Sequence, residues 1–152
     1  MSLIGHLLIM SVQETRGRLD CGLEGVPDPT SDDRIQGIRI FDVSDFSMPL
    51  QVGAVQTCRG SHTHTVVGQP DANGNAYVYV SGTSGVRDEE ELAGCTDDSP
   101  FENPESALFR IEVIEIPMDR PQDSRIVNRP FIFSDPNSGI LAGLWEGGDH
   151  GP

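Results

Sequence analysis

Residues 37–85, GIRIFDVSDFSMPLQVGAVQTCRGSHTHTVVGQPDANGNAYVYVSGTSG, decide the fold class of this chain. They contain four short runs of β-type residues, and turn residues separate one run from the next. Runs of this length rich in Val, Ile, Tyr, Phe and Thr are typical of strands, and Asn73-Gly74 is the strongest short hairpin signal. The stretch therefore predicts a series of antiparallel strands.

The composition of the whole chain supports an all-β fold. The 152 residues include 17 Gly and 11 Pro, which indicate many turns, and no segment shows sustained apolar spacing at i, i+3, i+4 and i+7. With 36% hydrophobic and 22% charged residues, the chain falls in the globular range rather than the disordered one. One domain of strands is predicted.

The net charge of -14 excludes a nucleic-acid partner, because ten scattered basic residues, all of them Arg, cannot form a surface that neutralises phosphates. The acidity indicates either a soluble surface or attraction of cations such as calcium. The chain has no apolar run of about 18 residues, so no membrane span is predicted.

The order of strands and loops can be predicted along the chain. Leu7–Val12 is an apolar strand with no earlier strand available to pair with it. Pro130 breaks the last predicted strand and restricts it to a sheet edge. The predicted strands are residues 7–12, 37–44, 50–56, 62–67, 77–81, 107–116 and 126–133, and the two long loops are 15–34 with Cys21 and 82–105 with Cys95.

An internal repeat appears when these segments are aligned. Strand, long loop with a Cys, strand, Pro turn and strand occur twice, and Ile9-Met-Ser11 matches Tyr79-Val-Ser81. A repeated four-stranded antiparallel unit is typical of a β-propeller blade. The chain is therefore expected to be a fragment of a longer protein: residues 1–56 an incomplete first blade, 57–133 a second blade, and 134–152 a linker toward a missing third blade.

At Gly37–Asp45 and Met48–Gly53 the sequence resembles the LVIVD-repeat proteins of bacteria and archaea. Their repeat has a short apolar strand, then Asp-x-Ser-[Asp/Asn], then a Pro and a second strand that ends in Gly. The likeness continues at Tyr77–Val80, whereas Ile111–Pro117 lacks the Asp-x-Ser element. The resemblance implies an exported, extracytoplasmic β-propeller whose signal peptide lies upstream, and it implies no catalytic residue.

His62 and His64 are the first candidates for a chemical site. Side chains two apart in a strand share a face, so both imidazoles would project together, and the first strand of a blade lines the propeller channel. Asp149 and His150 could reach the same channel and complete a site for a divalent metal ion. The alternative is that these histidines, with Ser61, form structural hydrogen bonds between blades.

The loops carry the remaining candidates. Arg16, Arg18, Arg59 and Arg87, with Ser61, could bind an anionic ligand on the rim, although loop solubility explains the arginines equally well. Acidic residues in 88–98 could gather a cation or form a solvated face. In an exported protein disulfides are allowed, and the predicted pair is Cys21 with Cys58, which leaves Cys95 for an external partner.

The predicted function is a non-catalytic binding module of an exported protein that presents both long loops on one rim. Its partners would be an unknown protein or glycan, together with the remaining blades of the parent chain. The alternative function is a metal-dependent hydrolase or oxidase with His62, His64 and His150 as ligands and Asp149 orienting one of them. A third possibility is an open β-sandwich that folds alone.

Overall fold

The computed structural model describes residues 1–132, 134, 135 and 137. These residues are nearly all in strands, turns and loops, which confirms the predicted all-β class. None of the helices in this part of the chain is long and apolar enough to cross a membrane. The elements are β1 (Ser2–Ile4), β2 (Leu7–Val12), β3 (Gly37–Asp42), β4 (Leu50–Gln56), β5 (Thr63–Val67), β6 (Asn75–Ser81), β7 (Glu112–Pro117), the 3-10 helix η1 (Pro121–Asp123) and β8 (Arg125–Asn128).

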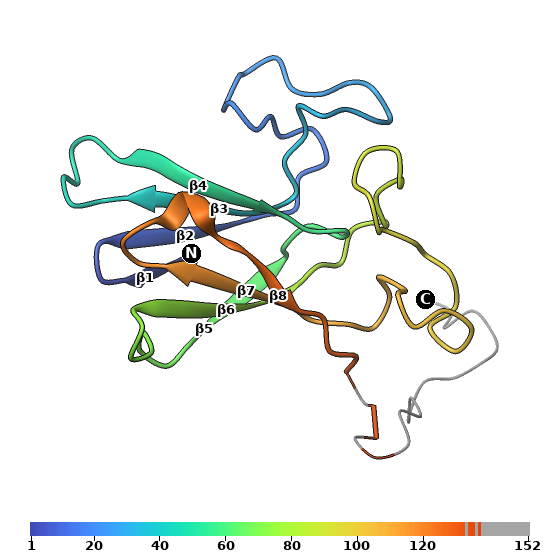
Figure 1. Cartoon of the computed structure of the whole chain (residues 1–152). Helices are drawn as coiled ribbons and strands as arrows, with labels where there is room; N and C mark the ends of the chain where they lie inside the picture. Colours follow the sequence, from blue (N-terminus) through green and yellow to red (C-terminus); the bar gives the residue numbers. More distant parts are fainter. Residues whose placement is uncertain (133, 136, 138–152) are drawn as a thin grey trace.

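The strands form two antiparallel four-stranded sheets, ordered β1-β2-β3-β4 and β5-β6-β7-β8 (Figure 1). Each sheet is a meander, in which consecutive strands pair, as in a propeller blade. The two sheets pack face to face, with β1 beside β5. The fold is thus all-β with the form of a partial β-propeller: two blades with long inserted loops.

The first sheet is complete, so two predictions about it were wrong. Leu7–Val12 does have an earlier partner, because β1 pairs with it from Ser2↔Ile9 to Ile4↔Leu7. Gly5 has φ +56 at the first position of the two-residue connection, where such hairpins need a glycine. Residues 1–56 therefore hold four strands rather than an incomplete blade. Gly5-His6, which separates two apolar segments in the sequence, is the hairpin connection between β1 and β2.

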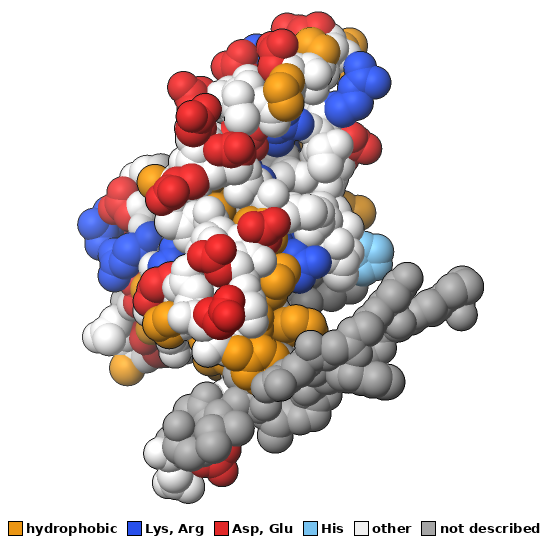
Figure 2. Space-filling view, turned by 90° about the vertical axis from the view of Figure 1, so that its right-hand side faces the viewer, with side chains coloured by type: hydrophobic (Ala, Val, Ile, Leu, Met, Phe, Trp, Pro, Cys, Tyr) orange, Lys and Arg blue, Asp and Glu red, His pale blue; other side chains and the backbone are white. Residues whose placement is uncertain are grey.

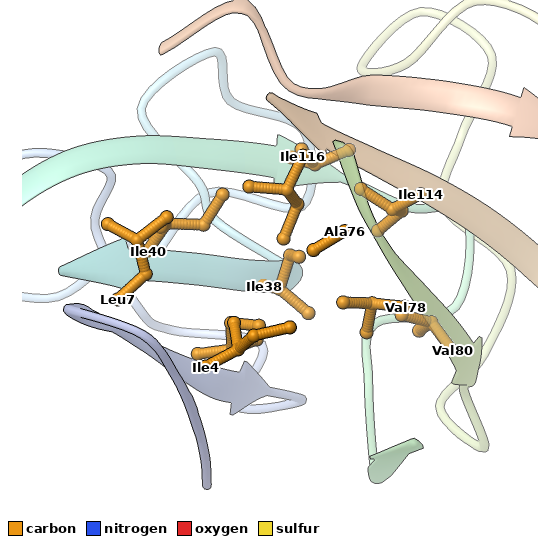
Figure 3. Packing of buried hydrophobic residues seen from close by; sticks show 11 residues of the cluster. Ile4, Leu7, Ile38, Ile40, Ala76, Val78, Val80, Ile114 and Ile116 are labelled. Carbon is orange, nitrogen blue, oxygen red and sulfur yellow. The ribbon is translucent and has the colours of Figure 1, made fainter. Parts of the chain in front are cut away.

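The core lies between the two sheets (Figure 3). Alternate residues of each strand point inward, as the period of two requires, so Ile38 and Ile40 from β3 meet Ile114 and Ile116 from β7. All four are fully buried. Burial of one such side chain stabilises the fold by about 1.5–3 kcal/mol. The other buried members of this cluster are Ile4, Leu7, Ile9, Val55, Ala76, Val78 and Val80.

The second sheet corrects the predicted bounds of its last two strands. β7 begins at Glu112 rather than at residue 107, and Phe109 has φ +55, a left-handed conformation that a strand does not contain. Residues 107–111 therefore belong to a loop, although their sequence alternates as in a strand. Backbone hydrogen bonds hold this segment in place, such as the one that the Ala107 N–H donates to the Thr96 carbonyl at 2.8 Å. β8 is shorter than predicted and lies at the sheet edge, as Pro130 indicated.

The repeated order of segments is confirmed. The orientation of equivalent residues agrees with stacked propeller blades better than with a sandwich whose two sheets are related by a two-fold axis. Both long loops join the second and third strands of their sheets, and Pro49 and Pro121 lie in equivalent turns. Ile9 is fully buried between the sheets, whereas its aligned partner Tyr79 is 43% exposed on the outer face. In a propeller, neighbouring blades stack with opposite faces in contact. Equivalent residues therefore point in the same direction around the ring, so only one of each pair lies between the two blades.

The connections divide between two ends of the molecule (Figure 1). At one end, here called the turn end, residues 5–6, 43–49, 68–74 and 118–124 make short turns. At the other, the loop end, residues 13–36 and 82–111 form the long loops and residues 57–62 join β4 to β5. The loop end contains the site described next.

Candidate functional site

A hollow of about 670 Å³ lies between the two long loops at the loop end. Its walls come from segments far apart in the sequence, and most of its lining side chains are polar or charged. We call it the rim hollow. Its lining residues are Thr15, Pro29, Thr30, Arg34, Gln36, Gly85, Val86, Arg87, Asp88, Glu89, Glu91, Cys95, Thr96 and Asp97.

Three charged side chains form a buried ion cluster in the wall of the rim hollow. Glu91 Oε2 accepts from Arg34 Nε at 2.9 Å, and Glu91 Oε1 accepts from Arg87 Nε at 2.6 Å. The side chains of Arg34, Arg87 and Glu91 are only 8%, 4% and 2% exposed. Charges this well buried must be paired, and here one carboxylate joins a guanidinium from each long loop.

Neighbouring groups hold the ion cluster in place. Arg34 also donates through Nη1 and Nη2 to the carbonyl oxygens of Thr15, Asp28 and Pro29, so both terminal nitrogens of its guanidinium hold its own loop. Arg87 Nη1 donates to Gln56 Oε1 at 2.6 Å, which ties the second loop to the end of β4. The loops are thus fixed to each other and to the first sheet.

Glu91 remains ionised in this setting. Burial by itself raises the pKa of a carboxyl group, but hydrogen bonds from Arg34, from the Ser31 amide at 2.8 Å and from Arg87 outweigh it and hold the Glu91 pKa below its ordinary value. The ion cluster therefore has two positive charges and one negative charge. Its charges sum to +1 by this count.

The outer wall of the rim hollow carries the opposite charge. Asp88, Glu89 and Asp97 line it and are exposed. Acidic side chains also spread over the upper part of the face shown in Figure 2, which is the side on which Figure 1 draws the loop end. A ligand in the rim hollow therefore meets a cationic group in the buried wall and carboxylates at the mouth.

A disulfide joins Cys58 to Cys95, so the predicted Cys21–Cys58 pair is wrong. Cys58 lies two residues after the end of β4, and both cysteines belong to a small buried cluster with Ala107 of loop 82–111. Cys21 is exposed and free, in the other loop, where Arg39 Nη1 donates to its Sγ at 3.2 Å. Cys21 and Cys95 occupy equivalent positions in the repeat, so the repeat does not indicate which of the two forms the disulfide with Cys58.

Ser61 and His64 form the predicted structural contacts between the sheets. Ser11 Oγ, in β2, lies 2.7 Å from His64 Nδ1 and 2.9 Å from Ser61 Oγ. Ser61 is buried, and its N–H donates to the Val12 carbonyl at 3.0 Å. His64 Nε2 is buried without a hydrogen-bond partner in the described part of the chain. Burial, with the N-terminal ammonium group, lowers the His64 pKa.

The predicted metal site is not assembled among the residues that the structure describes. β5 begins at Thr63, so the alternation that placed His62 and His64 on one face does not include His62, which lies exposed in a bend. No group of three His, Cys, Asp or Glu able to hold a metal ion occurs in 1–132, 134, 135 and 137. Asp149 and His150 lie outside these residues.

Three of the four arginines predicted to bind an anionic ligand, Arg16, Arg18 and Arg59, are spread over the loop end rather than brought together. Arg18 pairs with Asp20, at 2.8 Å, and with two further carboxylates, and its hydrogen bond to Asp20 is the main cause of its raised pKa. Arg59 Nε donates to Ser84 O at 2.9 Å. Arg16 lines a smaller hollow beside the first loop. None of these three lines the rim hollow, whereas the fourth predicted arginine, Arg87, does.

Arg34 and the role of Glu91 were not predicted from the sequence. One signal was present in the sequence, because Arg87 and Glu91 are four residues apart, the spacing of neighbours on a helical turn. The structure has such a turn here, since the Leu92 N–H donates to the Asp88 carbonyl at 3.0 Å. That spacing indicates a local ion pair. Nothing in the sequence indicates the third member, which lies 57 residues away from Glu91.

Comparisons with known protein families, with curated proteins and with solved structures find no match to this chain.

Proposed function

We propose that this chain is a non-catalytic binding module that receives a basic segment of a partner protein in the rim hollow. The observation that carries the proposal is a hollow of about 670 Å³ whose exposed lining includes Asp88, Glu89 and Asp97. Sites that take small ligands or parts of larger ones have volumes of about 300–1,000 Å³. A chain with net charge -14 also attracts a positively charged partner over a distance.

The cross-links of the loops support a binding role. Long loops usually lose conformational entropy when they bind, and this cost lowers affinity. Here the Cys58–Cys95 disulfide and the ion cluster of Arg34, Glu91 and Arg87 order both loops before any partner arrives. A preorganised polar hollow is better suited to recognition than a solvated loop would be.

We also propose that the module belongs to an exported protein of the LVIVD-repeat kind. Gly37–Asp45 carries the strand and Asp-x-Ser pattern, and in the fold it forms β3 and the turn that follows. The Cys58–Cys95 disulfide supports an oxidising compartment, because cytosolic proteins rarely keep such bonds. The two four-stranded meanders support the repeat.

Selection from a displayed library of random seven-residue peptides tests the binding proposal. We expect enrichment of peptides that contain Lys or Arg, with binding that weakens as salt is raised. The variant Asp88→Asn/Glu89→Gln/Asp97→Asn should lose this binding. The matched control Glu90→Gln/Glu102→Gln/Glu105→Gln removes the same charge from exposed residues outside the lining and should keep it.

Two results would count against the proposal. If no basic sequence is enriched, the rim hollow does not bind such segments. If both triple variants weaken binding equally, the attraction comes from the overall charge of the chain rather than from the rim hollow.

A further inference from the structure

We infer that the rim hollow binds the C-terminal end of a peptide, with the terminal carboxylate on Arg87 and a basic side chain on the outer carboxylates. This inference rests on the proposed function and names the part of the partner that enters. It starts from an imbalance in the ion cluster, where two guanidinium groups share the single carboxylate of Glu91.

Arg87 has unused binding capacity in the wall of the rim hollow. Its side chain is 4% exposed, Nε donates to Glu91 and Nη1 donates to Gln56 Oε1. Within the described residues its Nη2 has no hydrogen-bond or ion-pair partner. A buried guanidinium with a free N–H group favours a planar anion that accepts from it directly.

The surroundings select one class of anion. The exposed carboxylates of Asp88, Glu89 and Asp97 repel a group with two negative charges, such as a phosphate monoester. A carboxylate has one charge, and on a peptide it can be accompanied by Lys or Arg, which those same residues attract. The hydroxyl groups of Thr15, Thr30 and Thr96 in the lining can pair with the peptide backbone.

A chain end fits the rim hollow better than an internal segment does. Its volume of about 670 Å³ accommodates a few residues, and its two sides are closed by loops that are fixed to each other. An internal segment would have to leave the hollow at both ends. A terminus enters from the mouth and presents its charge to the buried wall.

Affinity selection with two synthetic peptide libraries tests the inference on the unmodified chain. Both libraries contain the same N-acetylated random hexapeptides, and one ends in a free carboxylate while the other ends in an amide. We expect the free acids to be retained at least about tenfold more strongly, since a hydrogen bond between charged groups is worth about 1.5–3 kcal/mol. Retained sequences should contain Lys or Arg.

The outcomes separate this inference from the proposed function. Equal retention of acids and amides, both dependent on Asp88, Glu89 and Asp97, would overturn the terminal carboxylate and leave the binding of basic segments standing. Retention of amides that contain an Asp or Glu side chain would place the carboxylate within the segment and would also overturn it. Retention of neither library would overturn both.

A variant of the protein gives an independent test. Arg87→Lys keeps the positive charge but loses the planar fork, so the preference for free acids over amides should be lost. Arg59→Lys, outside the rim hollow, is the matched control and should retain the preference. An undiminished preference for free acids in Arg87→Lys would overturn the inference.

Discussion

The turn end and the loop end close the same two sheets by different means. At the turn end, a side chain within the turn makes the contacts that hold the turn, as Asp71 does by accepting from the amides of Asn73 and Asn75 at 2.8 and 3.0 Å. At the loop end, beside local pairs such as Arg87 with Glu91, further contacts join residues 37 to 70 positions apart, from the disulfide to the Gln13–Thr83 hydrogen bond. Local chemistry therefore holds one end, and tertiary structure holds the other.

The aspartates of the turn end show how local that chemistry is. Asp42 Oδ1 accepts from the Ser44 amide at 2.8 Å, and Asp45 Oδ1 accepts from Ser47 at 2.9 Å through the amide and 2.6 Å through the hydroxyl. These bonds, which favour the ionised form, lower the pKa of both carboxyl groups. Each of these side-chain hydrogen bonds stays within its own turn.

The largest effect is expected where the loop end depends on one residue. Glu91→Gln leaves Arg34 and Arg87 buried without a carboxylate, and breaking a buried pair in this way costs about 3–5 kcal/mol. Hydrogen exchange should become faster throughout residues 13–36 and 82–111. Exchange at the turn end should change much less.

Glu90→Gln is the matched control for that experiment, because Glu90 is a neighbouring exposed residue outside the ion cluster. It should leave exchange in both loops unchanged. Equal acceleration of exchange at the two ends in Glu91→Gln would show that the two ends unfold as one unit. They would then differ in the contacts that they contain but not in how they unfold.

Removal of the disulfide should have the next largest effect. Cys58→Ser/Cys95→Ser opens a covalent loop with a sequence separation of 37, and we expect a loss of about 2–4 kcal/mol in urea unfolding. Cys21→Ser should change stability by less than about 0.5 kcal/mol, because that thiol is exposed and free. A comparable loss in Cys21→Ser would contradict the assigned pairing.

The same contrast explains what the sequence could predict. Alternation and turn residues gave the strand order, the long loops, the edge position of β8 and the turn at Asp71–Asn75, since each depends on neighbours in the chain. Some local signals were misread, among them the Gly5-His6 hairpin connection and the alternation in 107–111, which belongs to a loop. Partners at the loop end depend on how the two sheets pack, which no local pattern specifies, so Arg34 and the Cys58–Cys95 bond were missed.

A smaller effect is expected at the turn end. Asp71→Ala removes acceptors for two backbone amides and should cost about 1–2 kcal/mol. Asn73→Ala changes a side chain in the same turn for which no hydrogen bond is present in the described residues, and it should cost less than about 0.5 kcal/mol. Urea unfolding of both variants measures the difference. Similar losses in the two would mean that composition, rather than the Asp71 carboxylate, stabilises this turn.

The smallest effect concerns the pH dependence of stability at the border between the two ends. Burial lowers the His64 pKa from its ordinary value of 6.5, so the unfolded chain takes up a proton more readily than the folded chain does. The stability that depends on neutral His64 is therefore complete above pH 6.5 and is lost as the pH falls below it. The turn-end carboxyl groups of Asp42, Asp45 and Asp71, with ordinary values of 3.8 and lowered pKa, contribute only in a more acidic range.

Urea unfolding measured at intervals from pH 7.5 to pH 5 isolates this contribution. His64→Gln should flatten the decline in that interval, because Gln does not titrate, whereas His62→Gln should leave the decline as it is, since His62 is exposed in the bend before β5. If His64→Gln retains the full decline, protonation elsewhere causes it, and the contact of Ser11 with His64 Nδ1 at 2.7 Å is not sensitive to pH in this range. A flattened decline of stability would show that the contacts of Ser11 with Ser61 and His64 weaken in mild acid, at a higher pH than the turns held by aspartates.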